Sequence, residues 1–166
     1  MRRKGIVKAA VLALAALLLI LPVAGCGGKG GGGAKLSKSA YEKKLKNVGT
    51  RLQNTFQSLR SSPGSLDELA KQLGKGQSEL RKAADDLDSV TPPTDVKADH
   101  KKLIKAMRTI ADDLEPLKRA ADEGDPAKAQ EAAQKLQRSG AVQDAQRATE
   151  DMKSKGYDTG PIGRNG

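Results

Sequence analysis

Apolar residues recur every three or four positions along most of this chain, which is the spacing of one face of an α-helix. Four such stretches follow one another, and short segments containing proline or glycine separate them. Alternation with a period of two is absent from the sequence, and β-branched residues are few. The pattern predicts an all-α fold, an antiparallel up-down four-helix bundle that follows an N-terminal apolar segment and a glycine-rich linker.

The first two amphipathic stretches each begin at a predicted capping box, in which a serine is followed three residues later by a glutamate. Ser39 and Glu42 open the first stretch, and Ser65 and Glu68 open the second, after a break at residues 63–64. The first apolar stripe is Tyr41, Leu45, Val48, Leu52, Phe56 and Leu59, and the second is Leu66, Leu69, Leu73, Gly76, Leu80, Ala83, Leu87 and Val90.

Two glycines lie inside the second stretch without shifting its apolar phase. Gly74 and Gly76 each cost about 1 kcal/mol relative to alanine in a helix interior, so a soft or kinked helix is expected there.

Two architectures would bury the apolar faces of these stretches. One is the bundle, and the alternative is a long helical hairpin that completes its core by dimerising.

A proline-proline turn at residues 91–93 separates the second stretch from the third, because proline lacks the donor that continues a helix. Thr94 or Asp95 is expected to cap the third helix. Its apolar spacing continues through Pro116, so a kink is expected there rather than an end. The third stripe is Val96, His100, Leu103, Met107, Ile110, Leu114, Leu117 and Ala121.

The last stretch begins and ends at local signals. Gly-Asp-Pro at residues 124–126 is expected to end the third helix and to start the fourth, with the aspartate as N-cap. The apolar face turns by about half a circle after Leu136, so residues 139–140 are expected to break or re-aim the helix. Gly156 is a predicted C-terminal cap, and residues 157–166 are expected to be loose.

The N-terminal segment has the layout of a secretory signal, with a basic start followed by apolar residues 9–23. Its end resembles the lipobox of bacterial lipoproteins, in which two small residues precede an obligatory cysteine. The residues that carry this resemblance are Val23, Ala24, Gly25 and Cys26. The resemblance implies a diacylglyceryl thioether on Cys26 and cleavage after Gly25.

An ordinary signal peptide and an uncleaved signal anchor are the alternatives, since about 20 apolar residues span a bilayer. All three interpretations leave the remaining chain outside the cytoplasm, because the basic flank stays inside. The expected location is the extracytoplasmic face of the cell membrane, with a lipid anchor. The expected organisation is a signal peptide at 1–25, a lipidated cysteine and linker at 26–38, a bundle at 39–156 and a tail at 157–166.

Composition excludes several classes of function. The net charge is +10, and it falls to +6 without the four basic residues Arg2, Arg3, Lys4 and Lys8, which indicates a mixed surface rather than a nucleic-acid footprint. Cys26 is the only cysteine, so no disulfide or thiolate metal site is expected. With no tryptophan, two tyrosines and one phenylalanine, the chain offers few platforms for sugars.

His100 is the only histidine, and it lies on the third apolar stripe just after the proline turn. It could form a small ligand or metal site at the bundle tip with Asp95 or Asp99. It could equally be a partly buried residue that packs under the turn and bonds to a backbone carbonyl or an aspartate. A two-metal bundle site needs Glu-x-x-His motifs on two helices, and the chain has a single histidine. We assign no metal ligand, cofactor or catalytic residue.

These observations predict a membrane-anchored lipoprotein whose bundle is a non-enzymatic interaction or structural module of the cell envelope. Its expected partners are the membrane, through the lipid on Cys26, and an envelope protein or the wall. The chain resembles small helical lipoproteins of Gram-positive bacteria in its lipobox, in the Pro-Pro turn before His100 and in its helicity. The alternative function is a ligand or metal sensor that uses His100.

Overall fold

The computed structural model describes residues 34–58 and 63–163, and within these ranges it contains helices and no strand. The prediction of an all-helical fold is confirmed. The elements are α1 (Lys38–Ser58), α2 (Leu66–Asp88), η1 (Thr94–Val96), α3 (Lys97–Asp122), α4 (Pro126–Gln137), α5 (Ala141–Ser154) and η2 (Gly160–Gly163). None of the helices in these two ranges has the length and hydropathy needed to cross a bilayer. The predicted signal and lipobox lie outside the described residues.

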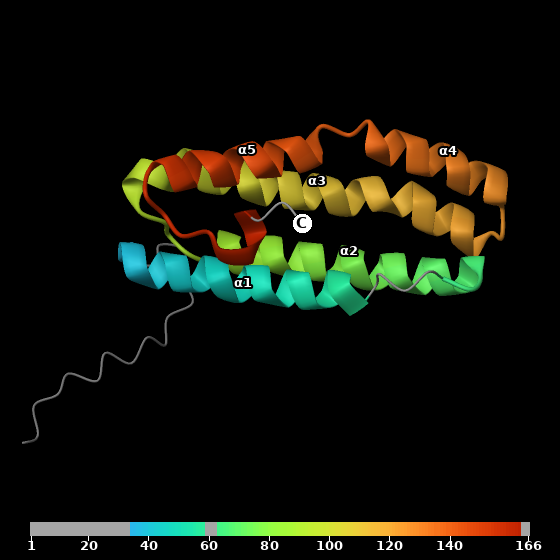
Figure 1. Cartoon of the computed structure of the whole chain (residues 1–166), viewed down its shortest axis with the longest axis horizontal. Coiled ribbons are helices and arrows are strands. Elements are labelled where there is room, and N and C mark those ends of the chain that lie inside the picture. Colours follow the sequence, from blue (N-terminus) through green and yellow to red (C-terminus); the bar gives the residue numbers. More distant parts are fainter. Residues whose placement is uncertain (1–33, 59–62, 164–166) are drawn as a thin grey trace, which may run out of the picture. The chain divides into compact units, whose positions relative to one another are not determined.

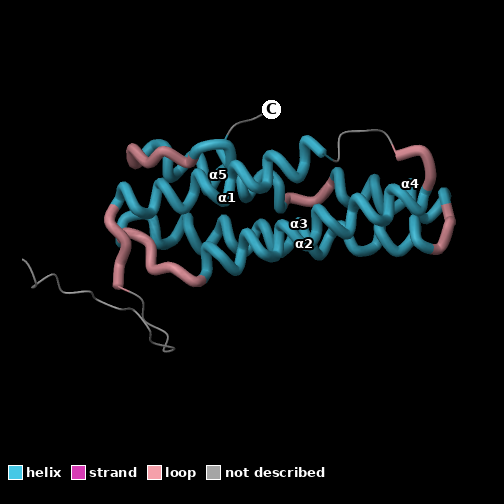
Figure 2. The backbone as a smooth tube through the Cα atoms, turned by 90° about the horizontal axis from the view of Figure 1, so that it is seen from below, coloured by secondary structure: helices cyan, strands magenta, loops and turns pink. Residues whose placement is uncertain are grey.

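α3 is the helix on which most of the others pack. It contacts α2 on one side, and α4 and α5 on another. α4 and α5 follow each other along α3, one beyond the other, in both views of the backbone (Figure 1, Figure 2). α1 packs against α2 and against η2, so the C-terminal segment returns to the first helix.

α1 covers only part of the length of α2. Backbone and side-chain contacts join residue 36 to residue 91, Lys44 to Asp86, and Arg51 to Glu79. Only seven residues of α1 follow Arg51, about 10 Å at a rise of 1.5 Å per residue. The N-terminal part of α2, which begins at Leu66, therefore lies beyond the end of α1 (Figure 1).

The predicted apolar stripes form the core. Of the third stripe, only Ile110 is partly exposed, and Leu80, Ala83 and Leu87 of the second stripe are buried. α3 and α4 share a second, smaller cluster of Leu117, Ala120, Ala129 and Ala132. Phe56, at the end of the first stripe, is 40% exposed. The core is therefore closed where α1 is present and thins beyond it.

Most of the local helix signals act as predicted. The Ser65 hydroxyl accepts the backbone N–H of Glu68 at 3.2 Å, and Asp125 caps α4 by accepting two backbone N–H groups. Gly124 and Gly156 adopt the left-handed φ values of 66° and 79° that favour glycine after a helix. The last stretch is broken as expected, because α4 ends at Gln137 and α5 starts at Ala141.

Two predicted caps are wrong. The hydroxyl of Ser37, and not that of Ser39, accepts a backbone N–H, from Ala40 at 3.3 Å, and α1 begins at Lys38. Neither Thr94 nor Asp95 caps α3, which follows η1 and has no side-chain cap. Both side chains bond instead to residues about 60 positions away, a preference that no local pattern could reveal.

The C-terminal segment that was expected to be loose packs against α1. Tyr157 and Thr159 are buried, and Ile162 contacts the main core. Asp158 pairs with Lys46 at 2.6 Å, and its backbone N–H donates to a carboxylate oxygen of Glu42 at 3.1 Å. By local rules, the glycines of this segment predict a loose chain. In the structure, Gly160 allows the backbone of the segment to approach that of α1 closely.

Candidate functional site

His100 lies in a polar cluster, part buried and part at the surface, at the end of the bundle where α1 begins. We call Tyr41, Asp95, Asp99, His100, Lys155 and Tyr157 the tip cluster. Nδ1 of His100 lies 2.9 Å from Oη of Tyr41, and the backbone carbonyl of Leu87 near the ring acts to raise the pKa of His100. When the imidazole is neutral with its proton on Nε2, Nδ1 accepts the proton of Tyr41.

Asp99 is the buried carboxylate of the tip cluster, and α5 supplies its partner. Only 3% of Asp99 is exposed, and Oδ2 accepts a hydrogen bond from Nζ of Lys155 at 2.6 Å. Nζ of Lys155 also donates to the backbone carbonyl of Asp95 at 2.9 Å. The hydrogen bond to Asp99 raises the pKa of Lys155 above its ordinary value. The lysine thus ties the end of α5 to the start of α3.

Asp95 accepts hydrogen bonds from Tyr157 rather than facing a ligand. The hydroxyl of Tyr157 lies 2.9 and 3.0 Å from the two carboxylate oxygens of Asp95. Burial and this hydrogen bond raise the pKa of Tyr157 to about 12. The ring packs edge to face with Tyr41, with centroids 6.0 Å apart. Asp95 therefore holds the C-terminal segment on the bundle.

The geometry of the tip cluster favours the structural interpretation of His100. Its ring is buried and bonds to the hydroxyl of Tyr41, a partner within the protein. Burial raises the pKa of Tyr41, so its hydroxyl stays protonated and acts as a donor. Among the described residues, no group of three or more histidine, cysteine, aspartate or glutamate side chains is arranged to hold a metal ion. The cluster locks three segments of the chain together.

Protonation of His100 is expected to destabilise the fold. Burial lowers the pKa of His100, although Asp88 and the bond to Leu87 act in the opposite direction. Between this lowered pKa and about 6.5, the unfolded chain binds a proton that the folded chain does not. The free energy of unfolding should therefore fall as the pH drops through this window, by up to about 1.4 kcal/mol per pH unit.

Urea unfolding, followed by circular dichroism from about pH 8 to about pH 5, measures this effect. His100→Gln keeps a polar side chain but cannot titrate, so its stability should depend less on pH than that of the wild type in this window. Parallel pH profiles for the two proteins would contradict the expectation. Carboxylates that titrate below the window are common to both proteins and cancel in the comparison.

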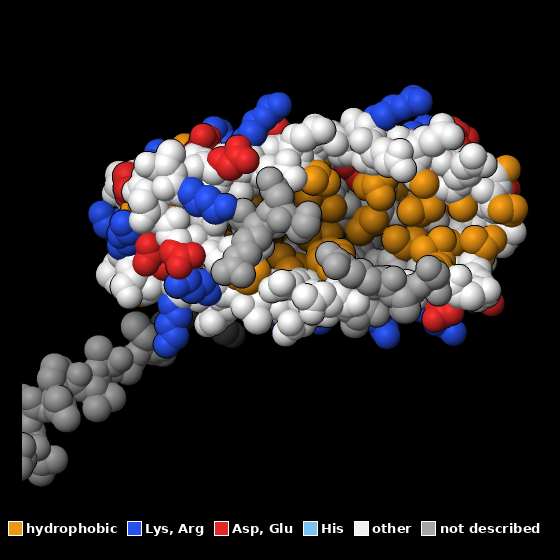
Figure 3. All heavy atoms as spheres, in the orientation of Figure 1, with side chains coloured by type: hydrophobic (Ala, Val, Ile, Leu, Met, Phe, Trp, Pro, Cys, Tyr) orange, Lys and Arg blue, Asp and Glu red, His pale blue; other side chains and the backbone are white. Residues whose placement is uncertain are grey.

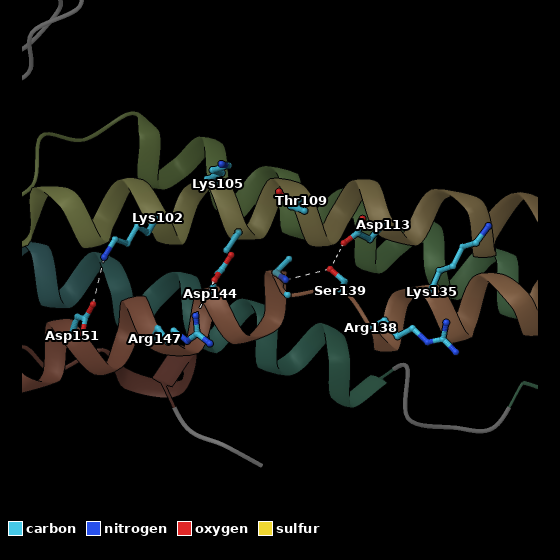
Figure 4. A pocket seen from close by; sticks show the side chains of 13 residues that line it. Lys102, Lys105, Thr109, Asp113, Lys135, Arg138, Ser139, Asp144, Arg147 and Asp151 are labelled. Atoms are coloured by element: carbon cyan, nitrogen blue, oxygen red, sulfur yellow. Dashed lines mark hydrogen bonds and ion pairs between the residues drawn. The ribbon is translucent and has the colours of Figure 1, made fainter.

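A second feature is a groove of 830 Å3 between α3 and the α4–α5 break (Figure 4). Four of its eight charged side chains form ion pairs with each other. Lys102 lies 3.7 Å from Asp151, Arg147 lies 3.8 Å from Asp144, and the Ser139 hydroxyl donates to Asp113. The labelled side chains line the edges of the groove and do not converge on one point (Figure 4). These contacts stabilise the break between α4 and α5 and do not bring reactive groups together.

The third feature is an apolar surface that the helices leave open. α2 and α4 both pack on α3 but not extensively on each other, and α1 ends before it reaches this part. We call this surface the open apolar face. Figure 3 shows apolar side chains around a hollow between α2 and α4, with charges mainly at the margins. Its partly exposed residues are Leu66, Leu69 and Leu73 of α2, Ile110 of α3, and Ala133 and Leu136 of α4.

Sequence reasoning assigned these residues to a closed core and missed the open face. One signal was present: the stretch that begins at residue 39 breaks at residues 63–64 and is shorter than the third stretch. The signal was insufficient, because the length of a helix does not fix its position along its neighbour. The contacts of Arg51 decide that position.

Comparison with known proteins adds no relative, since no protein-family model, no curated protein and no solved structure matches this chain. The role of the chain is therefore inferred from its own residues and contacts. The described part offers three features of different character. The residues of the tip cluster bond to one another, the charged groove contains two ion pairs, and the open apolar face has no packing partner among the described helices.

Proposed function

We propose that this chain is a lipoprotein anchored to the extracytoplasmic face of the cell membrane, whose helical bundle is a non-enzymatic binding module of the cell envelope. The lipid is attached to Cys26, after the lipobox residues Val23, Ala24 and Gly25. The observation that carries the binding role is the open apolar face, which no described helix covers. Contiguous exposed apolar surface of this kind commonly marks an interaction site.

The proposal takes the helices as an antiparallel up-down bundle, with α4 and α5 together as the fourth segment. The short turn between Asp122 and Pro126 supports this arrangement, because short connections favour antiparallel neighbours. Only three residues separate α4 from α5. In this arrangement the first helix is the one that falls short, which leaves the apolar face uncovered.

Contacts of the lysines near the linker support a lipid tether over an electrostatic one. Nζ of Lys35 donates to Thr94 at 3.0 Å, and Nζ of Lys38 lies 4.9 Å from the centre of the Tyr157 ring. Lys46 pairs with Asp158 at 2.6 Å. Cations that bind their own domain are less free to bind anionic headgroups, so the lipid carries most of the attachment.

Cys26→Ser is expected to abolish lipid attachment, because the serine hydroxyl cannot form the thioether. The variant should move from the membrane fraction to the soluble fraction, or should keep the size of the unprocessed precursor. Fractionation, gel mobility and metabolic labelling with a tagged fatty acid measure this result.

Gly27→Ser is the matched control, since it makes the same kind of change next to an intact lipobox. It should be processed, labelled and fractionated like the wild type. If Cys26→Ser were labelled and retained in the membrane like Gly27→Ser, the proposed anchorage would be wrong. If Gly27→Ser also lost its label, the loss could not be assigned to the cysteine thiol.

A further inference from the structure

We propose that the open apolar face binds an alkyl chain of a membrane lipid. The inference rests on the proposed anchorage, which keeps the bundle close to a bilayer, and it names the ligand of the proposed binding surface. It is carried by the shape, the length and the chemistry of the face, and by the length of chain between Cys26 and the bundle.

The face has the shape of a slot. Leu114 and Leu117 of α3, each 8% exposed, belong to the two core clusters that lie under the face, and we take them as its floor. Leu73 of α2 and Leu136 of α4 pack against this floor from the two sides and remain partly exposed. Figure 3 shows the hollow between the two walls. Because two concave faces cannot fill each other, the slot suits a narrow rod better than a second copy of the same surface.

The slot is short. By the pairing of Arg51 with Glu79, the end of α1 lies level with about residue 72, so the uncovered part of α2 that begins at Leu66 spans about 9 Å at a rise of 1.5 Å per residue. A helix seated along this length would contact it with only about six residues, and isolated helices shorter than about 12–15 residues are marginal in water. An alkyl chain has no such requirement.

The chemistry of the slot is that of hydrocarbon. Leucine, isoleucine and alanine side chains supply its walls and floor, without an aromatic ring or a charge among them. The buried polar atoms that lack a hydrogen-bond partner in the described part, on Glu79 and Thr159, are not among these residues. Sugars, nucleotides and peptides need polar groups to fix their orientation. A saturated chain needs only apolar contact.

The source of the chain follows from the anchor. Seven residues lie between Cys26 and the first described residue, Ala34, and the eight residue steps that join the two span at most about 26–29 Å when extended. A lipidated chain is therefore held near a bilayer at all times, where lipid tails are the most abundant apolar molecules. Moving a tail from the bilayer to the slot exchanges one apolar environment for another and covers leucines that otherwise face water.

The test uses the full, lipidated chain in vesicles of phosphatidylcholine and phosphatidylglycerol that contain a phosphatidylcholine with a diazirine at the end of its acyl chain. After illumination, mass spectrometry maps the crosslinked peptides. We expect crosslinks on the peptides of α2 and α4 that contain Leu73 and Leu136. A parallel sample receives a free diazirine fatty acid without vesicles, and the same peptides should be labelled.

Two variants change the slot and one does not. Ala133→Trp fills the slot while keeping it apolar, and the double variant L73Q/L136Q makes its walls polar. Both should lose most of the crosslinking at α2 and α4. Leu36→Gln is the matched control, because Leu36 is also partly exposed and packs on the main core, near residue 91. Circular dichroism shows which variants remain folded.

Labelling of the wild type away from α2 and α4 in both samples would overturn the inference, as would labelling that Ala133→Trp leaves intact. A crosslink between two copies at this face, or to a protein in native membranes that competes with the lipid, would overturn it as well. Flotation of the protein with the vesicles tests the anchorage separately. A chain that floats but is not labelled at the slot refutes the lipid site alone, and a chain that does not float refutes the anchorage.

Discussion

Tyr41→Ala is expected to lower the free energy of unfolding by about 3–5 kcal/mol, the usual cost of truncating a buried aromatic side chain. Tyr41 is completely buried, and its ring packs edge to face with His100, at a centroid distance of 5.6 Å, and with Tyr157. Its hydroxyl also lies 3.8 Å from the sulfur of Met152. One side chain of α1 thus contacts α3, α5 and the C-terminal segment, so its loss affects all three.

Tyr41→Phe separates packing from hydrogen bonding at the same position. The ring stays in place, but Nδ1 of His100 loses its donor and remains buried, which costs about 1–3 kcal/mol. Urea unfolding of the wild type and the two variants, followed by circular dichroism, measures both effects. Equal stability of the wild type and Tyr41→Phe would show that the bond to His100 contributes little.

Gly49→Ala is expected to destabilise the fold, in contrast to most glycine-to-alanine changes inside a helix. A Cβ atom at position 49 would lie 2.8 Å from Cγ1 of Ile162 and 2.9 Å from its backbone nitrogen. Because the second contact is with backbone, the C-terminal segment has to move. Overpacking of this kind costs about 1–3 kcal/mol, which outweighs the gain in helix propensity of up to about 1 kcal/mol.

Gly74→Ala is the matched control, because it makes the same change inside α2 at a site with room. The nearest atom to a Cβ there is the flexible Cε of Lys118 at 3.4 Å. This variant should be more stable than the wild type by about 0.5–1 kcal/mol. Urea unfolding measures the sign of the change in stability for both variants. Hydrogen exchange at residues 157–162 should become faster in Gly49→Ala only. A stabilised Gly49→Ala would show that the C-terminal segment is not held against α1.

The local signals of the sequence could be predicted because they act over a few residues. Asp125 caps α4 through backbone groups two and three positions away, and Gly124 ends α3 because a positive φ costs glycine little. The apolar stripes were equally visible, since a period of 3.6 places residues three or four positions apart on the same face. The lipobox at Cys26 is a local pattern of the same kind, and the anchor that it implies stays a prediction.

The environment of the candidate residues could not be predicted in the same way. His100 bonds to Tyr41, which is 59 positions away, and Asp95 bonds to Tyr157, which is 62 positions away. The sequence placed His100 in the core but could not choose its partners. Local rules consider only nearby donors, so Asp95 was expected to cap α3. In the structure its carboxylate accepts a hydrogen bond from the distant hydroxyl of Tyr157 instead.

By itself, the sequence determined which side of each helix is apolar and most of the points at which helices start and stop, because hydrogen bonds and steric limits within a few residues decide these properties. Only the tertiary structure decided which faces are covered. The position of α1 along α2 leaves Leu73 and Leu136 partly exposed, and the close approach at Gly49 draws the C-terminal segment onto the bundle. Coverage depends on the contacts of residues far apart in the chain, and the periodicity of a single helix carries no information about them.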